Sequence, residues 1–564
     1  MPSVKILSSL LLIIVIHATF AWFHNQARDA GPDVPSGKLR SLSFAPYHDG
    51  FSPITRKFPL PEHVDQDVQA VANKTYSIRT YSVRGGMQPT PAFARQYGVD
   101  MMMGAWLGDG HPENRIEIQT LIDAANQNWD VVKRVIVGNE VLLRKDMDID
   151  TLIGYIRQVK QAIKQPVTYA DVWSSYMQYP QLFKEVDFIT IHILPYWEDE
   201  PVAIEHAAAH VRKIVRQITD KAHSLDVSKP ILIGESGWPA IGRQRGAAVP
   251  SVVNEARFIR ELIQVANQQG FDYNIVEAFN QPWKSNSEGV VGANWGLLDI
   301  DREPVFPLTG PVTENPAWIM HFAWATGFCL LVVGIGFSSL QRLSLAQLLV
   351  FLTFAQLFGI GLVNQADLLW HTSYSLWQQS YTLFMVAASA VLAGLLLQRC
   401  YAVLSKRASA QPYAQALRYG YLFFVALAIY KTYHLAWDGR YLSFPIAQFS
   451  IPALGVIAVA ACFWLNQGRP RINLAELTGS PVRHPKQGLL SYLLGFGMLA
   501  LIAGETYSFM SAYDFIQAHP DFQAGLPIAL GYTLQNHQLL NWLLCALLLA
   551  LPFWPARISI PPRE

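Results

Sequence analysis

The pattern of hydrophobic and polar positions divides the chain near residue 312. Before that point, short apolar runs alternate with amphipathic stretches, a pattern that predicts strands joined by helices. Beyond it, apolar runs of about 20 residues follow one another with short basic breaks, and such runs match the length of a membrane-spanning helix. The chain therefore predicts a soluble domain followed by an all-α, multi-pass membrane domain.

Eight strand-like runs precede residue 312, with helical segments between them. They cover 41–47, 77–82, 101–107, 134–140, 167–173, 188–195, 231–235 and 274–279. Amphipathic stretches at 113–128, 149–163, 202–224 and 253–268 fit crossover helices. Alternating strands and helices predict a parallel sheet, and eight strands in about 270 residues predict an α/β fold, a closed (β/α)8 TIM barrel over residues 41–312.

The first 40 residues predict a targeting segment and a linker. Lys5 precedes an apolar run that ends at Phe23, so residues 1–23 predict either a cleaved signal peptide or an uncleaved signal anchor. Because Thr19-Phe20-Ala21 is only a fair cleavage site, the sequence favours the anchor. Residues 24–40, rich in Gly, Pro and Asp, predict a linker.

Seven apolar runs predict about seven transmembrane helices within residues 313–556. They lie near 317–339, 343–363, 376–398, 419–437, 445–465, 488–510 and 531–553. The segments on one side of these helices hold Lys5, Arg342, Arg399, Lys406, Arg407, Arg418, Arg469, Arg471, Arg483, Lys486, Arg557 and Arg563. The short loops on the other side hold only Arg440. The positive-inside rule therefore predicts the barrel outside and residues 557–564 as a cytoplasmic tail.

Charge and cysteine usage exclude several classes of site. A formal net charge of +1 gives no reason to expect nucleic acid as a partner. All four cysteines lie in the membrane half, so the barrel has no disulfide framework and no thiolate metal site. His206 and His210 have a spacing that metal ligands use, but a solvated helix face is the preferred interpretation. No metal and no cofactor are predicted.

Two of the strand-like runs end in a glutamate. Ile231-Leu-Ile-Gly-Glu235 and Arg134-Val-Ile-Val-Gly-Asn139-Glu140 each consist of an apolar strand, a glycine and then a carboxylate. About three βα units separate the two glutamates, so Glu140 and Glu235 should face each other across the barrel mouth. Two facing carboxylates are the minimum machinery for glycoside cleavage. Unrelated, salt-bridged carboxylates are the alternative interpretation.

The residues around both glutamates resemble a known family. Val137-Gly138-Asn139-Glu140 and Gly234-Glu235-Ser236-Gly237-Trp238-Pro239 resemble two signatures of family 17 glycoside hydrolases, the β-1,3-glucanases and β-1,3-glucanosyltransferases. Arg79-Thr80-Tyr81, Tyr169-Ala-Asp-Val-Trp173, Glu277-Ala-Phe-Asn-Gln-Pro-Trp-Lys284 and Asn294-Trp-Gly-Leu297 support the resemblance, which covers residues 38–310. It implies a (β/α)8 barrel, retention of configuration, Glu140 as acid/base and Glu235 as nucleophile.

Aromatic side chains near the strand ends are candidate platforms for sugar rings, because these rings present apolar C–H faces. Any one of them can instead belong to the core, and Trp238 is equally suited to support the turn after Glu235. The aromatic candidates for substrate contact are Tyr47, Tyr81, Trp173, Tyr196, Trp238 and Phe279, with Trp197 and Trp283 in similar positions.

Polar side chains at the same strand ends are further candidates. Asn139 could hydrogen-bond a sugar 2-hydroxyl, and Lys284 and Glu288 resemble a charged pair of the family. His192 and Glu277 could contact substrate or have buried structural roles. The polar candidates for substrate binding are Arg79, Asn139, His192, Glu277, Lys284 and Glu288.

Three ionisable residues lie inside the predicted membrane runs: Lys431, His434 and Glu505. Such groups are costly in lipid and often mark a pathway. Because all three are near predicted helix ends, anchoring and packing are the preferred interpretation over transport or glucan handling.

Fusion of the barrel to a membrane domain favours an enzyme that remodels β-1,3-glucan by transglycosylation. The layout also resembles bacterial membrane proteins described as β-(1,6)-glucan synthases, which implies β-1,6 links and a bacterial inner-membrane location with the barrel on the periplasmic side. The expected partners are β-glucan as donor and acceptor, the lipid bilayer, and glucan synthesis or export machinery. Two alternatives stay open: a membrane-anchored endo- or exo-β-1,3-glucanase, and a non-catalytic glucan-binding cap on an exporter.

Overall fold

The computed structural model describes residues 2–406, 412–482 and 486–554. The chain forms two compact units: one is Ala27–Glu314, and the other joins the residues up to Gln26 with those from Asn315 onward. The predictions made for Arg407, Arg483, Arg557, Arg563 and the tail 557–564 lie outside the described residues.

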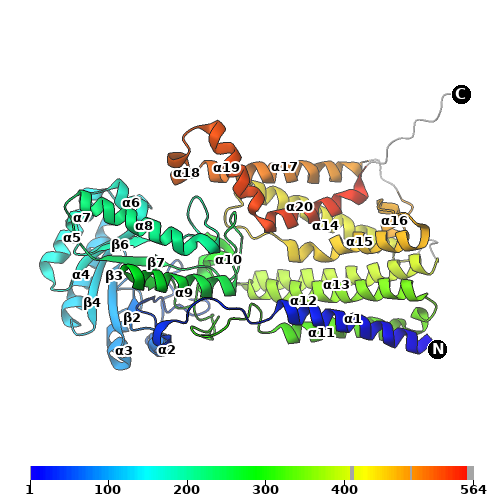
Figure 1. Ribbon diagram of the computed structural model, residues 1–564, viewed down its shortest axis with the longest axis horizontal. Coiled ribbons are helices and arrows are strands. Elements are labelled where there is room, and N and C mark those ends of the chain that lie inside the picture. Colours follow the sequence, from blue (N-terminus) through cyan, green and yellow to red (C-terminus); the bar gives the residue numbers. More distant parts are fainter. Residues whose placement is uncertain (1, 407–411, 483–485, 555–564) are drawn as a thin grey trace. The chain divides into compact units, whose positions relative to one another are not determined.

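The first unit, which includes the strands labelled β2, β3, β4, β6 and β7 in Figure 1, is a closed barrel of eight parallel strands. Each strand pairs with the next, and β1 pairs with β8. The strands are β1 (Leu42–Ser43), β2 (Ser77–Arg79), β3 (Asp100–Ala105), β4 (Val132–Asn139), β5 (Val167–Val172), β6 (Ile189–His192), β7 (Ile231–Ser236) and β8 (Asp272–Ile275). The predicted TIM barrel is confirmed, and each predicted run overlaps one strand.

Helices connect the strands, and four of them match the predicted crossover helices within a few residues. These four are α4 (His111–Gln127), α5 (Ile149–Ala162), α8 (Ile204–Ser224) and α9 (Val252–Gln269). The sequence analysis missed α2 (Pro61–Ala72), α3 (Thr90–Tyr97), α6 (Trp173–Gln178), α7 (Leu182–Glu185) and α10 (Ser285–Gly292), together with the 3-10 turns η1 (Pro35–Gly37) and η2 (Pro282–Lys284). Most of these are too short to show a helical period in the sequence.

The predicted linker is part of the barrel unit from Ala27 onward. Ala30, Val34 and Leu39 are buried in the same core cluster as the barrel residues. Arg28 pairs with Val312 through two backbone hydrogen bonds of 2.8 and 2.9 Å. The Gly- and Pro-rich composition therefore reflects an irregular but packed segment, which corrects the prediction of a free linker over residues 24–40.

The end of β4 has an unusual backbone at the first of the two glutamates. Gly138 has a φ of +87°, and a Cβ there would lie 2.9 Å from the Val141 side chain. Glu140 has a φ of 51°, in the left-handed region that non-glycine residues rarely adopt. Its N–H donates to the Ala170 carbonyl of the neighbouring strand at 2.9 Å, which holds this conformation. Strain of this kind at a carboxylate is typical of functional sites.

The second unit is all-helical. Its long helices are α1 (Pro2–His24), α11 (Trp318–Leu340), α12 (Leu345–His371), α13 (Leu376–Leu404), α14 (Ala414–Asp438), α15 (Ile446–Gln467) and α17 (Gly488–Met510). The shorter ones are α16 (Leu474–Thr478), α18 (Tyr513–Ala518), α19 (Phe522–Gln535), α20 (His537–Ala550) and η3 (Leu551–Phe553). Among the described helices, α1, α11, α12, α13, α15 and α17 are long and apolar enough to cross a membrane.

Two of the seven predicted spans differ from a simple apolar helix. Helix α14 has 25 residues, but it carries Arg418, Lys431 and Asp438 and is not among the six apolar spans. The run 531–553 covers only the end of α19 together with α20, and the full pair, Phe522–Gln535 and His537–Phe553, is bent by 73°. The break falls at Asn536, whose side chain accepts a hydrogen bond from the Leu539 N–H and so starts a new helix.

Helix α1 packs against α11 and α12 of the second unit. Ile6 is fully buried there, and Leu10 is 6% exposed. The Lys5 ammonium donates to the Gln341 carbonyl at 3.2 Å, and His17 contacts the Gln356 amide at 2.9 Å. The N-terminal helix is thus part of the helical unit.

Candidate active site

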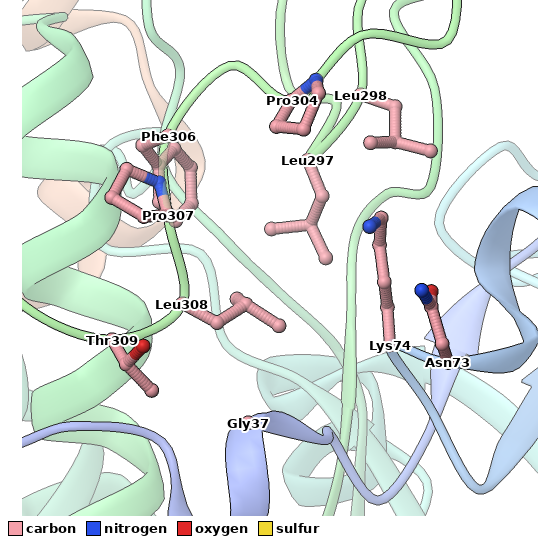
Figure 2. Close-up of a pocket in the computed structure, with 10 residues that line it drawn as sticks. All are labelled: Gly37, Asn73, Lys74, Leu297, Leu298, Pro304, Phe306, Pro307, Leu308 and Thr309. Carbon is pink, nitrogen blue, oxygen red and sulfur yellow. The ribbon is translucent and has the colours of Figure 1, made fainter.

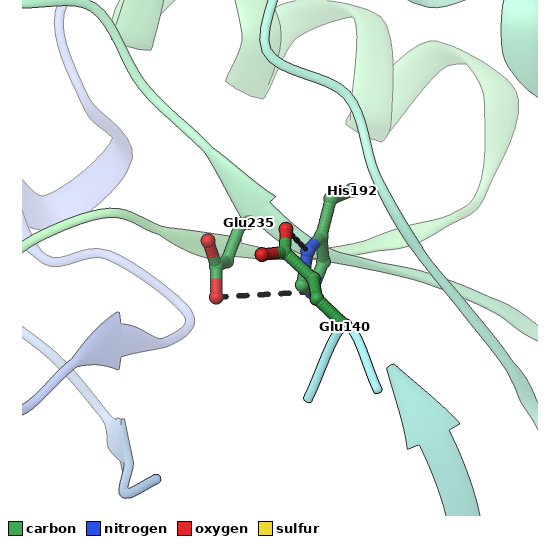
Figure 3. Close-up of side chains that lie close together, drawn as sticks. All are labelled: Glu140, His192 and Glu235. Atoms are coloured by element: carbon green, nitrogen blue, oxygen red, sulfur yellow. Dashed lines mark hydrogen bonds and ion pairs between the residues drawn. The ribbon is translucent and has the colours of Figure 1, made fainter. Parts of the chain in front are cut away.

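The two predicted glutamates meet at the mouth of the barrel, with a histidine beside them (Figure 3). The imidazole Nδ1 of His192 lies 2.8 Å from Oε1 of Glu140, and its Nε2 lies 3.8 Å from Oε1 of Glu235. One donor atom from each of the three side chains falls within 4.8 Å of the others. The Glu140 side chain is 23% exposed and that of Glu235 is 12% exposed, whereas His192 is enclosed. Both carboxylates therefore reach one small, accessible volume.

Gly234 makes room for the histidine. A Cβ on Gly234 would lie 3.2 Å from both Cδ2 and Nε2 of His192, and 2.6 Å from the Thr190 methyl. The glycine that precedes Glu235 therefore allows the imidazole to sit directly beneath the two carboxylates.

Arg79 ties the two glutamate strands together. Its guanidinium donates to the Gly234 carbonyl at 2.6 Å, to Oε1 of Glu235 at 3.1 Å, and to the Asn139 side-chain oxygen. Arg79 itself is 1% exposed. Burial alone would raise the pKa of Glu235, but His192 and Arg79 outweigh burial and hold the pKa below its usual value. The environment thus keeps Glu235 ionised, as a nucleophile requires.

Asn139 is turned toward the arginine. Its side-chain oxygen accepts from Arg79, and its backbone carbonyl accepts from Arg144 at 2.6 Å. Asn139 as a whole is 7% exposed. Contact with a sugar 2-hydroxyl stays a prediction.

A second group of charged side chains lies next to Glu235. The Lys284 ammonium is 2.7 and 2.8 Å from the two oxygens of Glu277. Burial raises the pKa of Glu277 to about 7, although Lys284 lowers it. Burial also raises the pKa of Glu288, which interacts electrostatically with Lys284 and with both catalytic candidates. Glu277 and Glu288 thus add two carboxyl groups and Lys284 adds one ammonium group to the surroundings of Glu235.

Three aromatic residues that were predicted to contact substrate are buried. Tyr196, Trp238 and Phe279 have no exposed surface. The Tyr196 hydroxyl donates to the Arg243 carbonyl, and the Trp238 N–H donates to the Val249 carbonyl at 2.9 Å. Their prediction as sugar platforms is therefore corrected: they pack behind the mouth and support the loops that carry the charged groups.

The other aromatic candidates keep accessible surface. Tyr47 and Trp283 pack edge-to-face, with centroids 6.0 Å apart, and Trp197 stacks on Trp295 at 6.3 Å. Trp173 donates from its indole N–H to Glu198 at 3.2 Å. Tyr81 bonds to the Ser43 hydroxyl at 2.9 Å, under the Arg79 guanidinium. These rings remain candidates for contact with sugar.

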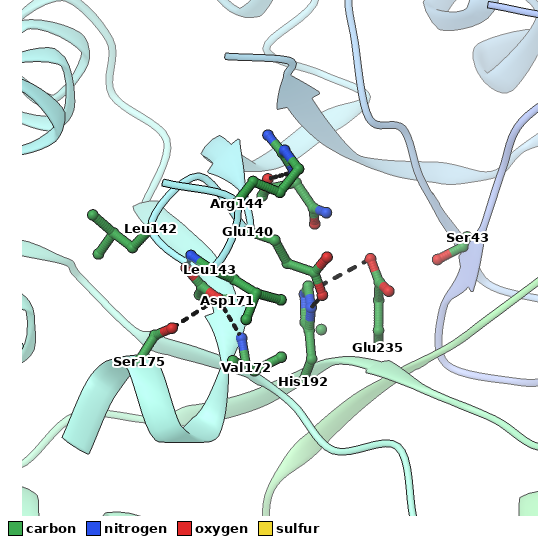
Figure 4. A network of polar contacts seen from close by, with 12 residues as sticks. Ser43, Glu140, Leu142, Leu143, Arg144, Asp171, Val172, Ser175, His192 and Glu235 are labelled. Atoms are coloured by element: carbon green, nitrogen blue, oxygen red, sulfur yellow. Dashed lines mark hydrogen bonds and ion pairs between the residues drawn. The ribbon is translucent and has the colours of Figure 1, made fainter. Parts of the chain in front are cut away.

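Asp171 belongs to the motif Tyr169–Trp173 but was not predicted to contact substrate. It lies on β5 beside Glu140 and accepts from the Ser175 hydroxyl at 3.0 Å and from the Tyr169 hydroxyl (Figure 4). Burial raises the pKa of Asp171, while the Tyr169 hydrogen bond opposes this and the Glu140 charge adds to it. Its position inside the motif Tyr169–Trp173 was the feature of the sequence that could have identified it.

Glu140, His192 and Glu235 have the donor types that a metal ion needs, and they are the one such group among the described residues. However, His192 Nδ1 already pairs with Glu140 at 2.8 Å, while its Nε2 lies 3.8 Å from Glu235. His206 and His210 do not join them; His210 instead lies 3.2 Å from Glu198. A separate cavity of about 200 Å³ is lined by Lys74, Leu297 and Phe306, among others, and by none of the predicted site residues (Figure 2).

Comparisons with known proteins agree with this geometry. Residues 41–296 match the family described as the BtgE/BtgC glycoside hydrolase domain. The chain is 27% identical over 258 residues to a glucan 1,3-beta-glucosidase of Arthroderma benhamiae, covering 43% of this chain and 82% of that protein. It is 25% identical over 280 residues to a probable beta-glucosidase btgE of Aspergillus flavus, covering 48% of this chain but only 44% of that protein.

Among solved structures, the chain is similar to a glycoside hydrolase family 17 beta-1,3-glucanosyltransferase from Rhizomucor miehei. The identity is 26%, the TM-score is 0.42, and the match covers 48% of this chain and 96% of that one. These matches cover less than half of the chain and come from fungi, so they do not support the predicted bacterial location or the resemblance to β-(1,6)-glucan synthases. Residues 41–296 are similar to a glycoside hydrolase domain, and the two curated relatives are described as a glucan 1,3-beta-glucosidase and a probable beta-glucosidase.

Proposed function

We propose that this protein is a membrane-tethered, retaining β-glucan enzyme that remodels β-1,3-glucan by transglycosylation. The observation that carries the proposal is the approach of Glu140 and Glu235 to within 4.8 Å around His192. Retaining glycosidases place their carboxyl groups about 5–5.5 Å apart, whereas inverting enzymes need about 6.5–9.5 Å to admit a water.

The proposed reaction has two displacements. Glu235 attacks the anomeric carbon as a carboxylate, and protonated Glu140 gives its proton to the glycosidic oxygen as the bond to the leaving sugar breaks. A glycosyl-enzyme ester on Glu235 results. An acceptor hydroxyl then attacks the same carbon, Glu140 takes the hydroxyl proton, and Glu235 leaves as a carboxylate. Water in place of the acceptor gives hydrolysis, so the choice of acceptor decides between the two outcomes.

Side chains around the pair suit these roles. Arg79 binds Glu235 at 3.1 Å and orients it, while His192 binds one oxygen of Glu140 and leaves the other free to protonate a leaving group. Lys284 partly compensates the negative charge that Glu277 and Glu288 add to the site. The aromatic side chains at the mouth offer faces for neighbouring sugar rings.

Tethering is supported by the helical unit. Six of the described helices suit a membrane span, and α1 packs among them, as an uncleaved anchor would. Most basic residues outside the barrel fall in segments on one side of the spans, which favours an extracytoplasmic barrel. A membrane enzyme gains little from hydrolysing dissolved glucan, and this favours transfer onto glucan of the cell envelope.

Incubation of the purified full-length protein with laminari-oligosaccharides tests the proposal. Products longer than the donor are expected, and NMR of their linkages shows whether β-1,6 bonds are formed. NMR of the first product should show the β-anomer, the result of retention. If all products are shorter than the donor even at high acceptor concentration, the protein is an anchored β-1,3-glucanase. If no product forms and glucan still binds, the barrel is a binding cap.

A further inference from the structure

The helical unit contains a cavity of its own, with a volume of about 450 Å³. It lies where the C-terminal ends of α14 and α17 meet. The side chains that matter for its chemistry are Trp437, Asp438 and Arg440 from the end of α14 and the loop after it, and Glu505, Tyr507 and Ser508 from α17. Pockets for small ligands have volumes of about 300–1,000 Å³, so this one is large enough for a sugar or a short oligosaccharide.

The two helices are held in close contact at the base of the cavity. A Cβ on Gly504 would lie 2.2 Å from the Ala436 carbonyl oxygen, so only glycine permits this approach of α17 to α14. Helix α14 ends two residues later, at Asp438, and the chain turns away through Gly439. The close crossing therefore fixes the cavity walls, and the end of α14 opens the space between them.

The lining is unusual for a helical unit in a membrane. Glu505 is 7% exposed although it lies on one of the apolar spans, and an ionisable side chain in such a place normally marks a functional site. Beside it, Trp437 and Tyr507 are 92% and 72% exposed. Carboxylates and exposed aromatic rings around one cavity are the groups that recognise hydroxyls and the C–H faces of a sugar ring.

The charges at the cavity argue against an anionic ligand. Asp438 and Glu505 contribute two negative charges and Arg440 one positive charge, so a phosphate or carboxylate would be repelled. A neutral ligand with many hydroxyl groups can donate to both carboxylates and accept from Arg440 and Ser508.

We propose that this cavity is a second saccharide site, which binds a segment of neutral β-glucan at the membrane surface. The proposal rests on the proposed function, since that supplies glucan on the outer side of the membrane. If α11, α12, α13 and α14 are successive spans, the end of α14 returns to the side on which α11 begins, directly after the barrel. Adding α15 and α17 brings the end of α17 to the same side. The site would hold a glucan chain on the outer side of the membrane between rounds of transfer.

Equilibrium dialysis of laminarihexaose against the full-length protein in lipid nanodiscs tests this site. A Glu235→Gln background prevents turnover of the ligand. Two bound hexasaccharides per protein are expected, and one after Trp437→Ala is added. Trp437→Ala is the main variant because Trp437 is largely exposed, so its replacement should not disturb folding. Glu505→Gln is a second variant of the same cavity and should also leave one bound hexasaccharide. Trp377→Ala is the matched control: Trp377 is 80% exposed at the start of α13 but does not line the cavity, and the control should keep both sites.

Three results would overturn the inference. One is unchanged stoichiometry after Trp437→Ala. Another is an equal loss in Trp377→Ala, which would mean that these tryptophans only anchor the protein in the bilayer. The third is native mass spectrometry showing a phospholipid retained by the parent and lost from the Trp437→Ala protein, which would make the cavity a lipid site. Failure of the proposed function gives a different result. Glucan cleavage and the hexasaccharide bound at the barrel would be missing, while a hexasaccharide lost on Trp437→Ala would still report the cavity in the helical unit.

Discussion

The imidazole of His192 contacts the Glu140 carboxylate at 2.8 Å through Nδ1, while its buried Nε2 has no hydrogen-bond partner among the described residues. The ring therefore depends on Glu140 for its orientation, and Glu140 depends on the ring. The charged groups that face this pair are Glu235 from β7, Asp171 from β5 and Arg79 from β2, with Lys284 from the loop after β8.

Replacing His192 should therefore slow catalysis rather than weaken binding. In His192→Asn, Glu140 loses its orienting contact, and we expect kcat to fall by about tenfold to a hundredfold. This fall is equivalent to an increase of about 1.4–2.7 kcal/mol in the activation free energy. KM should change little, and the pH profile of kcat should shift. Steady-state kinetics on laminari-oligosaccharides across pH measures both. A raised KM with unchanged kcat would instead make His192 a substrate-binding residue.

The two glutamates should differ in how they respond to removal. Glu235→Gln should reduce turnover to background, because no nucleophile remains to form the glycosyl-enzyme. Glu140→Gln should reduce cleavage of laminari-oligosaccharides by about 10²–10⁴-fold. It should spare an aryl glucoside whose leaving group needs no proton. Equal losses of Glu140→Gln on both substrates would argue against its role as the acid.

Gly234 offers a steric test of the same arrangement. In Gly234→Ala the new methyl meets Thr190 at 2.6 Å and the His192 ring at 3.2 Å, so we expect a loss of about 1–3 kcal/mol in stability and reduced kcat. Gly154→Ala on α5 is the matched control. Nothing lies within 4 Å of its Cβ position, and alanine there should stabilise the helix by up to about 1 kcal/mol. Thermal unfolding monitored by tryptophan fluorescence compares them, and equal stability of the two variants would contradict the close packing at Gly234.

Glu277 should make the stability of the protein depend on pH. Its pKa is about 7 in the folded protein, whereas it titrates near 4.5 when unfolded. Between these values the folded state binds the extra proton, so the contribution of this group to stability falls as pH rises from about 4.5 to 7. Glu277→Gln imitates the protonated form. As the pH rises from about 4.5 to 7, the free energy of unfolding of Glu277→Gln should therefore increase by about 3 kcal/mol relative to that of the parent, which is the equivalent of the pKa difference.

Denaturant unfolding of both proteins at pH 5, 6 and 7 measures that gain. Above pH 7 the difference should become constant, because Glu277 is then ionised in both folded and unfolded states. A difference that is the same at all three pH values would mean that the Lys284 pair keeps Glu277 ionised throughout.

The N-terminal helix should remain in the mature protein. Ile6 and Leu10 are buried in the helical unit, and Lys5 binds the Gln341 carbonyl at 3.2 Å. Cleavage after Ala21 would remove these contacts. Intact mass spectrometry of the protein purified from membranes should therefore find residues 1–21, and a mass that lacks them would contradict an anchor. Lys5→Glu, which opposes the positive-inside bias, should lower the amount inserted.

The sequence predicted the parts of the site that follow from the order of strands. Glu140 and Glu235 end apolar runs, and a parallel barrel places such ends at one mouth, so their meeting needed no tertiary detail. The direction of a side chain at a strand end is harder to predict. Tyr196 and Phe279 are fully buried and pack edge-to-face with Trp238 and Phe44, and these contacts depend on the tertiary structure.

The helical unit shows a similar limit. For α11, α12, α13, α15 and α17, hydropathy placed most of the helix ends to within a few residues. Length and apolar content decide whether a helix can cross a membrane, and both can be read from the sequence. It treated the last run as one span because the polar break between α19 and α20, Gln535-Asn536-His537-Gln538, is short and has long apolar segments on both sides. The contact of Gly504 with Ala436 also depends on which helices are neighbours, and no periodicity within one helix reveals that.

The bridge between Arg28 and Val312 brings the two ends of the barrel side by side, so the barrel is an insertion between α1 and the remaining helices. During synthesis α1 must wait while the whole barrel is translated before α11 and α12, its packing partners, emerge from the ribosome. In the proposed membrane topology, α1 alone would hold the nascent chain in the bilayer throughout that interval, and the barrel would have time to close before the other helices assemble.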